Sequence, residues 1–203
     1  GRLLKDSLAT RQAFEKWVTE YPVIHLATHA RADDTLPANS YITFFGENPD
    51  SARLYEPGIY QLDLSGTRLA ILSACETGTG KLENSEGIIS LSRAFTYAGC
   101  HSVITSLWKA NDEATAYIST RLHHYLGNGY RADEALQLAK SEYLDNDDIE
   151  SRFKKPSYWA TLVLTGDPAA ITQRTNWWIP VGLVLIMLIA VLAWLLKRTR
   201  RVF

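Results

Sequence analysis

The feature that most constrains the fold is a short apolar run, residues 69–72, that gives way at once to small polar residues. The run is too short for a helix and shows no polar alternation, so it predicts a strand buried on both faces, as in a parallel sheet. Cys75 follows this strand, and glycines at 78 and 80 permit tight turns. Open α/β sheets bind their ligands at the carboxyl ends of such strands. Cys75 is therefore a candidate nucleophile if a base lies nearby.

A second stretch of the same kind, residues 21–30, supplies a candidate base. It predicts another buried strand that ends at His29. Neighbouring strands lie about 4.8 Å apart, so adjacent strands could bring this imidazole to the thiol of Cys75. The alternative for His25 and His29 is a zinc-binding helix, but that motif needs glutamate after the first histidine, and here Leu26 follows. We expect no metal ion, and we interpret His25, inside the strand, as structural.

The rest of the domain alternates strands with helices. This order implies parallel pairing and a three-layer α/β domain. The expected strands cover residues 40–45, 101–108 and 158–165. The expected helices begin near residue 10 and near residue 87, and two more cover residues 112–127 and 132–144.

The composition of the 203 residues, 46% hydrophobic with a net charge of −1, is typical of one globular domain with an appendage. No basic stripe runs through residues 1–178, which hold all 22 acidic side chains, so we expect no nucleic-acid partner. The two cysteines, Cys75 and Cys100, do not make a disulfide framework. Cys100 precedes a predicted strand, and we interpret it as a small buried hydrophobic residue.

Residues 179–196 form an apolar stretch without a charge. With the two tryptophans before it, at about 1.5 Å per residue, it spans roughly 30 Å, the thickness of a hydrocarbon core. The tryptophans and the basic tail at 197–203 are typical interface anchors. The sequence therefore predicts one C-terminal transmembrane helix, joined by a linker at 171–178 to a domain at 1–170. The positive-inside rule favours a cytoplasmic tail and an extracytoplasmic, periplasmic domain; the alternative is a tail anchor with the domain in the cytoplasm.

Four stretches resemble, in order and spacing, the motifs of the CHAT domain, the bacterial branch of the caspase-like and separase-like cysteine proteases. They read HLATHA, LSACETGTG, SEGIISLSRAFTYAGCHSVITSLWKANDEAT and YWATLVLTGDP. The resemblance runs from about Ala9 to Pro168. It implies a caspase-like three-layer α/β/α sandwich with a mostly parallel sheet. It also implies that the chain begins partway into the domain, after its first strands, and that helical repeats or sensor domains precede it.

By this resemblance, His29 is the general base and Cys75 the nucleophile of a Cys–His dyad that needs no metal or cofactor. The backbone N–H groups of Cys75 and of residue 30 would form the oxyanion hole. The family usually has glycine at this second position, and here Ala30 stands in its place. Alanine keeps the N–H, but a positive φ would cost it on the order of 1 kcal/mol. A misaimed donor would cost about 10²-fold in rate.

Two acidic residues are candidate substrate-binding groups. Asp112 follows the strand at 101–108 in a loop that resembles the corresponding loop of separases, which cleave after arginine. Its carboxylate could therefore pair with a basic P1 side chain. Glu76, next to the nucleophile, could bind substrate or orient His29. The remaining histidines, His101, His123 and His124, show no partner pattern and are interpreted as surface or satisfied polar residues.

The favoured interpretation is a membrane-anchored cysteine endopeptidase that cuts a protein substrate and is controlled by upstream domains. The main alternative is a pseudo-protease, an interaction module that uses the same fold to bind a partner at the membrane, and Ala30 is its direct support. A third interpretation is another thiol hydrolase, such as an amidase or glutaminase, which would ignore peptide length and P1 charge.

Overall fold

The structure is a computed structural model that separates into two compact units, residues 1–172 and residues 173–203. It describes residues 1–33, 35–73, 75–76, 86–108, 111–168 and 187, with only the backbone for 75, 76 and 86–90. The first unit contains every described residue except Met187.

The main sheet of the first unit has the strand order β1-β5-β7-β8. β1, β5 and β7 are parallel neighbours, and β8 pairs antiparallel with β7. The strands cover Val23–Leu26 (β1), Leu69–Leu72 (β5), Ser102–Ser106 (β7) and Leu162–Gly166 (β8). A mixed α/β fold with a mostly parallel sheet is therefore confirmed.

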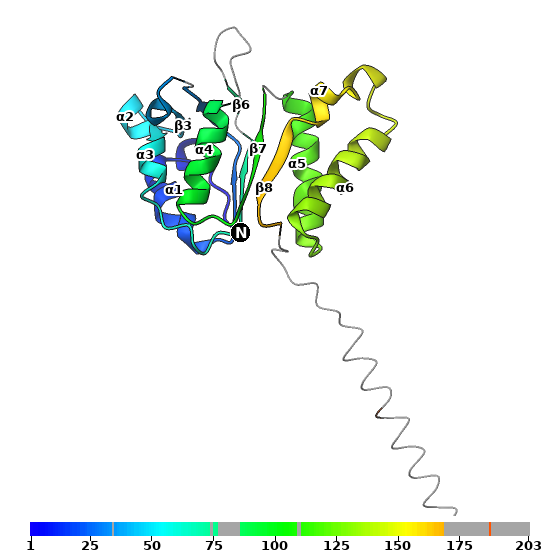
Figure 1. The fold of residues 1–203 in the computed structure, drawn as a ribbon, viewed down its shortest axis with the longest axis horizontal. Helices are drawn as coiled ribbons and strands as arrows, with labels where there is room; N and C mark the ends of the chain where they lie inside the picture. The colour runs from blue at the N-terminus through cyan, green and yellow to red at the C-terminus, as the bar shows by residue number, and fades with distance from the viewer. Residues whose placement is uncertain (34, 74, 77–85, 109–110, 169–186, 188–203) are drawn as a thin grey trace, which may run out of the picture. The chain divides into compact units, whose positions relative to one another are not determined.

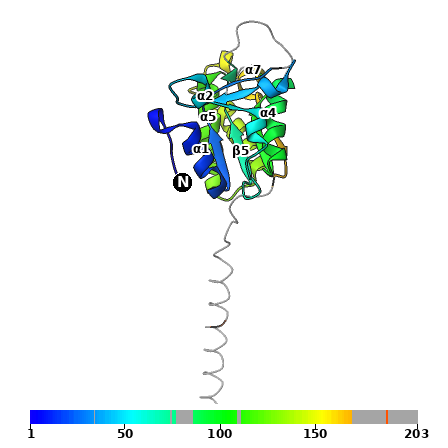
Figure 2. The same ribbon diagram turned by 90° about the vertical axis from the view of Figure 1, so that its left-hand side faces the viewer.

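The central strands β5 and β7 are buried on both faces, as the apolar run predicts for β5. Alternate residues of a strand point to opposite faces, and β5 divides in this way between two cores. Leu69 and Ile71 belong to one core, and Ala70 and Leu72 to the other. The helices α1, α3 and α4 lie on one side of the main sheet and α5 and α6 on the other (Figure 1); Figure 2 looks onto the first of these layers.

Helices α1 and α5 begin after residues with clear capping chemistry. α1 (Arg11–Trp17) begins after Thr10, whose side chain accepts a hydrogen bond from the N–H of Ala13 at 3.1 Å. α5 (Asp112–Gly127) begins after Asn111, whose side chain accepts from the N–H of Ala114 at 3.0 Å. A side-chain acceptor at this position satisfies a backbone donor that has no partner within the helix. The other long helices are α4 (Glu86–Tyr97) and α6 (Ala132–Asp145).

The last strand differs from the sequence prediction in its extent and direction. Residues 156–159 form a short helix, α7 (Pro156–Trp159), because a proline at the first helical position favours helix entry. β8 runs antiparallel because two helices, α5 and α6, lie between it and β7. The second helix returns the chain to the edge at which β7 ends, so β8 must run in the opposite direction.

A second, smaller sheet has the order β4-β3-β2-β6; the sequence predicted a strand at 40–45, which contains β3, but not a separate sheet. Its strands cover His29–Arg31 (β2), Tyr41–Thr43 (β3), Arg53–Tyr55 (β4) and Cys75–Glu76 (β6). The remaining short elements are η1 (Asp6–Leu8), η2 (Val18–Glu20), η3 (Pro37–Asn39), α2 (Pro49–Ala52), α3 (Glu56–Ile59) and η4 (Ser151–Phe153).

The predicted transmembrane stretch, residues 179–196, lies outside the described residues except for Met187. Within the part of the chain that the structure describes, none of the helices has both the length and the apolar character needed to cross a membrane.

Gly99 ends α4 in a geometry that needs glycine. The N–H of Gly99 bonds the carbonyl of Thr96, and the N–H of Cys100 bonds that of Phe95, each at 3.0 Å, which is the Schellman pattern. Gly99 has a φ of +107°, and a Cβ there would lie 2.9 Å from the backbone nitrogen of Ser65. The helix end and the loop at residue 65 are thus packed against each other through this glycine.

We expect Gly99→Ala to lower the free energy of unfolding by about 1–3 kcal/mol, through backbone strain at positive φ and contact with Ser65. Gly127→Ala is the matched control, because a Cβ at Gly127 meets no atom within 4 Å. In α5 that change should be neutral or stabilising by up to about 1 kcal/mol. Urea denaturation of both variants checks the pair; equal stability would contradict the role given to Gly99.

Candidate functional site

The candidate site forms where two neighbouring strands leave the main sheet and pair again in the small one. β1 and β5 are parallel and end with Leu26 opposite Leu72. β2 and β6 are also parallel, with His29 opposite Cys75. On each segment, three positions separate the residue of the first pair from that of the second, so the two segments keep the same register through the crossing. The backbones of the predicted base and the predicted nucleophile are therefore direct neighbours.

A backbone hydrogen bond lies inside this crossing. The N–H of Ser73 donates to the carbonyl of Leu26 at 3.0 Å, one residue beyond the end of β5. On the other segment, the Thr28 hydroxyl donates to the carbonyl of Thr43 in β3 at 2.5 Å. Each segment is thus attached to a neighbouring strand between its last residue in the main sheet and its first residue in the small one.

His29 is exposed and Ala30 is buried, as expected for successive residues of a strand. Ala30 pairs with Ile42 on one side and with Glu76 on the other. Among the described residues other than glycine, only Asp6 has a positive φ, so Ala30 has an ordinary strand backbone. The strain considered for an alanine at this position is therefore absent from the backbone of residue 30.

Cys75 and Glu76 are described through their backbones, so a role for the Glu76 side chain remains a prediction. Asp112 is the first residue of α5 and is exposed. α5 follows β7, whose carboxyl end lies at the same edge of the main sheet as that of its parallel neighbour β5. Asp112 therefore begins a helix at the sheet edge from which the chain continues to Cys75.

Cys100 does not belong to this site. It is buried, and its thiol donates to the carbonyl of Ser102 at 3.1 Å. Burial raises the pKa of the Cys100 thiol, which disfavours the reactive thiolate. This agrees with its interpretation as a small buried hydrophobic residue.

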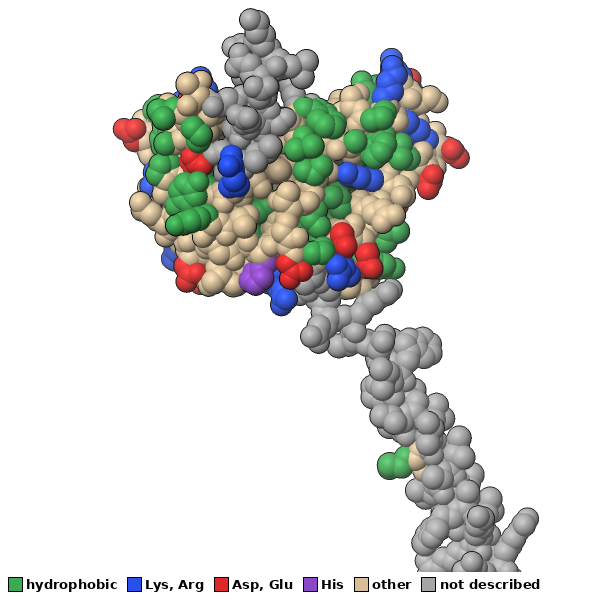
Figure 3. Space-filling model, in the orientation of Figure 1, with side chains coloured by type: hydrophobic (Ala, Val, Ile, Leu, Met, Phe, Trp, Pro, Cys, Tyr) green, Lys and Arg blue, Asp and Glu red, His purple; other side chains and the backbone are tan. Residues whose placement is uncertain are grey.

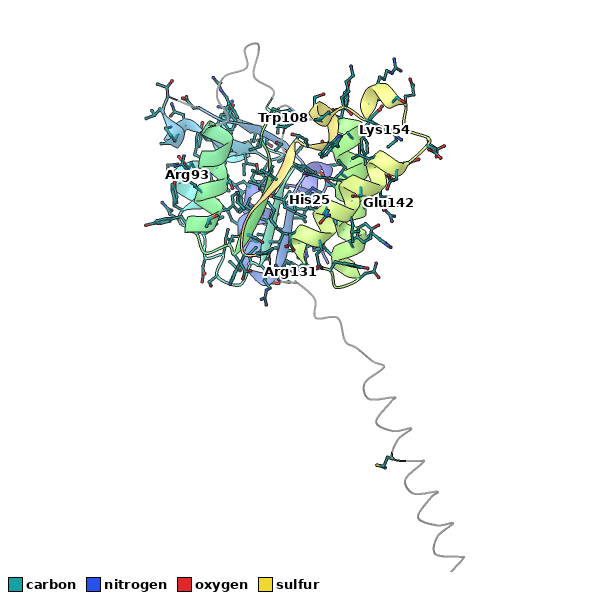
Figure 4. All side chains as sticks on the ribbon, turned by 45° about the vertical axis from the view of Figure 1, so that its right-hand side comes forward. His25, Arg93, Trp108, Arg131, Glu142 and Lys154 are labelled. Atoms are coloured by element: carbon teal, nitrogen blue, oxygen red, sulfur yellow. The ribbon has the colours of Figure 1, made fainter. Side chains whose placement is uncertain are left out.

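Sequence reasoning missed a polar cluster next to the crossing. The His25 ring, from β1, lies with Nδ1 2.8 Å from Nε2 of His123 in α5 and with Nε2 2.9 Å from the Ser73 hydroxyl. The Ser73 hydroxyl lies 3.4 Å from that of Ser119, also in α5. Figure 4 labels His25 between the strands and the helical layer. His25 and His123 are 98 positions apart, so no local pattern could have paired them.

Both histidines of this cluster are held in the neutral form. Burial, and then repulsion from His123, lowers the pKa of His25 from 6.5 to about 4. Partial burial lowers the pKa of His123 as well, although part of its surface is exposed. At neutral pH the two rings are therefore uncharged, and their contact is a hydrogen bond between a ring N–H and an unprotonated ring nitrogen.

The surface around these elements carries charges of both signs. On the face that Figure 3 shows, basic and acidic side chains of the described residues are interspersed. The ion pairs of the described residues include that of Arg121 with Glu142, which joins α5 to α6 at 2.6 Å. This pattern is typical of a solvated surface.

Comparison with known proteins gives one family and two relatives. The sequence description of the CHAT domain matches residues 2–167. Tetratricopeptide repeat protein 28 of Homo sapiens is 26% identical over 205 aligned positions, which include 85% of this chain. The Mus musculus protein of the same name is 24% identical over 209 positions, again with 85% of this chain. The chain spans only 8% of the length of either relative.

The pKa of His25 predicts how the stability of the domain depends on pH. Because the folded value of about 4 lies below 6.5, the unfolded chain binds a proton first as the pH falls. The contribution of the neutral His25 ring to the free energy of unfolding is therefore complete above about pH 6.5, and it is lost as the pH falls toward 4. Between pH 7 and pH 5 we expect His25 to account for a loss of about 2 kcal/mol.

Urea denaturation at these two pH values checks this expectation. His25→Gln should remove most of the difference, because glutamine does not titrate. His124→Gln is the matched control, since His124 is exposed and bonds Asn128, the residue that caps the end of α5, rather than the cluster. An unchanged pH dependence in His25→Gln would contradict the assignment of the proton to this ring.

Proposed function

The chain belongs to the CHAT domain family, and on that premise we propose that it is a caspase-like cysteine endopeptidase with His29 and Cys75 as its catalytic dyad. The observation that carries the proposal is the pairing of His29 with Cys75 in neighbouring parallel strands. The exposure of His29 further supports it, since a general base must reach both the thiol and the substrate. The CHAT family belongs to the caspase-like peptidase clan. That this chain has catalytic activity is our inference.

In the proposed reaction, His29 accepts the proton of the Cys75 thiol, and the thiolate attacks the scissile carbonyl carbon. The oxyanion of the tetrahedral intermediate is held by the backbone N–H groups of Cys75 and Ala30. His29 then donates its proton to the leaving amine as the C–N bond breaks, which leaves a thioester. Water, activated by His29, hydrolyses the thioester and regenerates the thiol.

Specificity for a basic P1 residue is the finer part of the proposal. Asp112 supports it because it is an exposed carboxylate at the start of α5. A P1 arginine would form charge-assisted hydrogen bonds with this carboxylate. Glu76, directly after the nucleophile, is proposed to contact substrate near the scissile bond or to orient His29.

The context of the domain is also proposed. The name of the two mammalian relatives supports upstream tetratricopeptide repeats, which would act as a regulatory or partner-binding part. The apolar stretch 179–196 supports a single-pass membrane anchor, with the domain on the extracytoplasmic side and the basic tail in the cytoplasm.

A second candidate function is a pseudo-protease that binds a partner protein through the same fold. Two observations favour it: alanine stands in place of the family's glycine at position 30, and the relatives are named for their repeats rather than for an activity. The two candidates differ at Cys75. A peptidase carries a reactive thiolate there, whereas a binding module needs none.

We expect the full chain to cut a positional peptide library after arginine or lysine and to be labelled at Cys75 by an acyloxymethyl-ketone probe. Cys75→Ala should abolish cleavage and labelling, and His29→Ala should slow both by at least about 10²-fold. Cys100→Ala is the matched control and should keep them. Absence of labelling in the wild-type chain would support the pseudo-protease instead.

Asp112→Asn should reduce cleavage after basic residues by about 10-fold or more while leaving the rate with neutral P1 residues unchanged. Glu113→Gln is the matched control, because it removes a neighbouring exposed carboxylate from the same helical turn. Measurement of kcat/KM with paired arginine and norleucine substrates distinguishes the two. Equal losses in both variants would show a general charge effect rather than a P1 pocket.

We expect Ala30→Gly not to raise the activity, because Ala30 has no positive φ that a glycine would relieve. The change should instead lower the free energy of unfolding by about 0.5–1 kcal/mol, through glycine within a strand. Thermal denaturation and kcat/KM measure the two effects separately. A rise in kcat/KM of tenfold or more would show that the Cβ of Ala30 displaces an oxyanion donor.

A further inference from the structure

The polar cluster of His25, His123, Ser73 and Ser119 has no role in the proposed reaction, yet it lies at the base of the crossing. Ser73 is the residue at which the β5 segment leaves the main sheet. Its N–H bonds Leu26, and its hydroxyl bonds the ring of His25. Its backbone is thus fixed to β1, and its side chain to a ring that α5 also holds. Cys75 follows two residues later.

The cluster can form one continuous chain of hydrogen bonds with both rings neutral. If Nδ1–H of His25 donates to His123, then Nε2 of His25 accepts from the Ser73 hydroxyl, which in turn accepts from Ser119. In the other tautomer every bond reverses. The separations of 2.8, 2.9 and 3.4 Å allow either direction, with the last the weakest. A chain of this kind fixes the His25 ring at both nitrogens.

The surroundings of His25 keep this chain of hydrogen bonds uncharged. From α5, His123 is the titratable group that faces His25. Repulsion from His123 lowers the pKa of His25 and so disfavours the charged ring. From the segment after β5, the facing group is the uncharged hydroxyl of Ser73. No carboxylate within the described part of the chain contributes to the pKa of His25. A ring with so low a pKa is a poor general base at neutral pH, so the Ser73–His25 pair is better suited to holding position than to catalysis.

We infer that His25 is a positioning residue for the nucleophile: its bond to Ser73, with the ring held by His123, fixes the segment that brings Cys75 beside His29. The inference rests on the proposed function, since it assigns a cause to the reactivity of Cys75. Loss of the bond frees the Ser73 side chain at the crossing. The thiol of Cys75 then spends less time within reach of His29, and its thiolate is less favoured.

Two substitutions at His25 separate its two contacts. Glutamine places an amide near the position of Nε2 and can keep the bond to Ser73. Asparagine places its amide near Nδ1 and can keep only the bond to His123. We expect His25→Gln to remain within about threefold of the wild type in reactivity of Cys75. His25→Asn and Ser73→Ala should each lower it by about tenfold or more at pH 7, and His124→Gln should leave it unchanged.

The measurement is the rate of alkylation of Cys75 by iodoacetamide from pH 5 to pH 10, followed by mass spectrometry of the peptide that contains it. In the wild type, the plot of alkylation rate against pH should have its inflection below the ordinary thiol pKa of about 8.5. In His25→Asn and Ser73→Ala, this inflection should move toward that value. With peptide substrate, the same variants should lose kcat at nearly constant KM. A merely structural role would change stability without moving either readout.

The outcomes distinguish this inference from the proposed function. If His29→Ala shifts the alkylation profile but His25→Asn and Ser73→Ala do not, the dyad stands and the positioning role is wrong. If the wild-type profile is that of an ordinary thiol and His29→Ala leaves it unchanged, both proposals fall. Should His25→Asn fail to fold, Ser73→Ala decides the question, because it removes only a hydroxyl. A wild-type profile in that variant overturns the inference.

Discussion

The candidate site depends on one constraint, the shared register of two parallel segments across two sheets. Leu26 lies opposite Leu72 in the main sheet, and His29 lies opposite Cys75 in the small one. The connection between these pairs has the same length on both segments. A residue inserted into only one of them would shift the pairing and turn the side chains of that strand to the opposite face. The chemistry proposed for the dyad therefore rests on backbone pairing before it rests on any side chain.

This register is maintained by the main sheet, whose central strands β5 and β7 are buried on both faces. The alternate residues of β5 enter two different cores, and α4 and α5 pack on opposite sides of the strands. A slip of β5 by one residue would exchange its two sets of apolar side chains between cores of different shape, at the cost of close packing. The short β6 segment has little pairing of its own. Its position is set by the buried strand that precedes it, through Ser73.

The sequence was sufficient for the elements with strong local patterns. The apolar run at 69–72 identified β5, and the helix predicted at 112–127 has the same bounds as α5. The sequence also predicted that His29 and Cys75 lie side by side, because each follows a predicted buried strand, although the small sheet itself was not predicted. The small sheet was not predicted as a separate sheet, although its strand β3 lies within the predicted strand at 40–45, because its strands are only two or three residues long, too short for any periodicity. The partner of His25 was missed because a contact between a strand and a helix 98 positions away leaves no local trace.

His25 and His29 show how one short segment of chain can give the same side chain two opposite environments. His25 belongs to β1, in the main sheet, where burial and a second histidine lower its pKa to about 4. Four residues later the chain has crossed to the small sheet, and His29 is exposed. A structural ring benefits from the first environment, because a neutral ring keeps its hydrogen bonds over the physiological pH range. A catalytic base needs the second, where it can exchange protons with thiol, substrate and water. The crossing between sheets therefore gives the two histidines the separate environments that their proposed roles require.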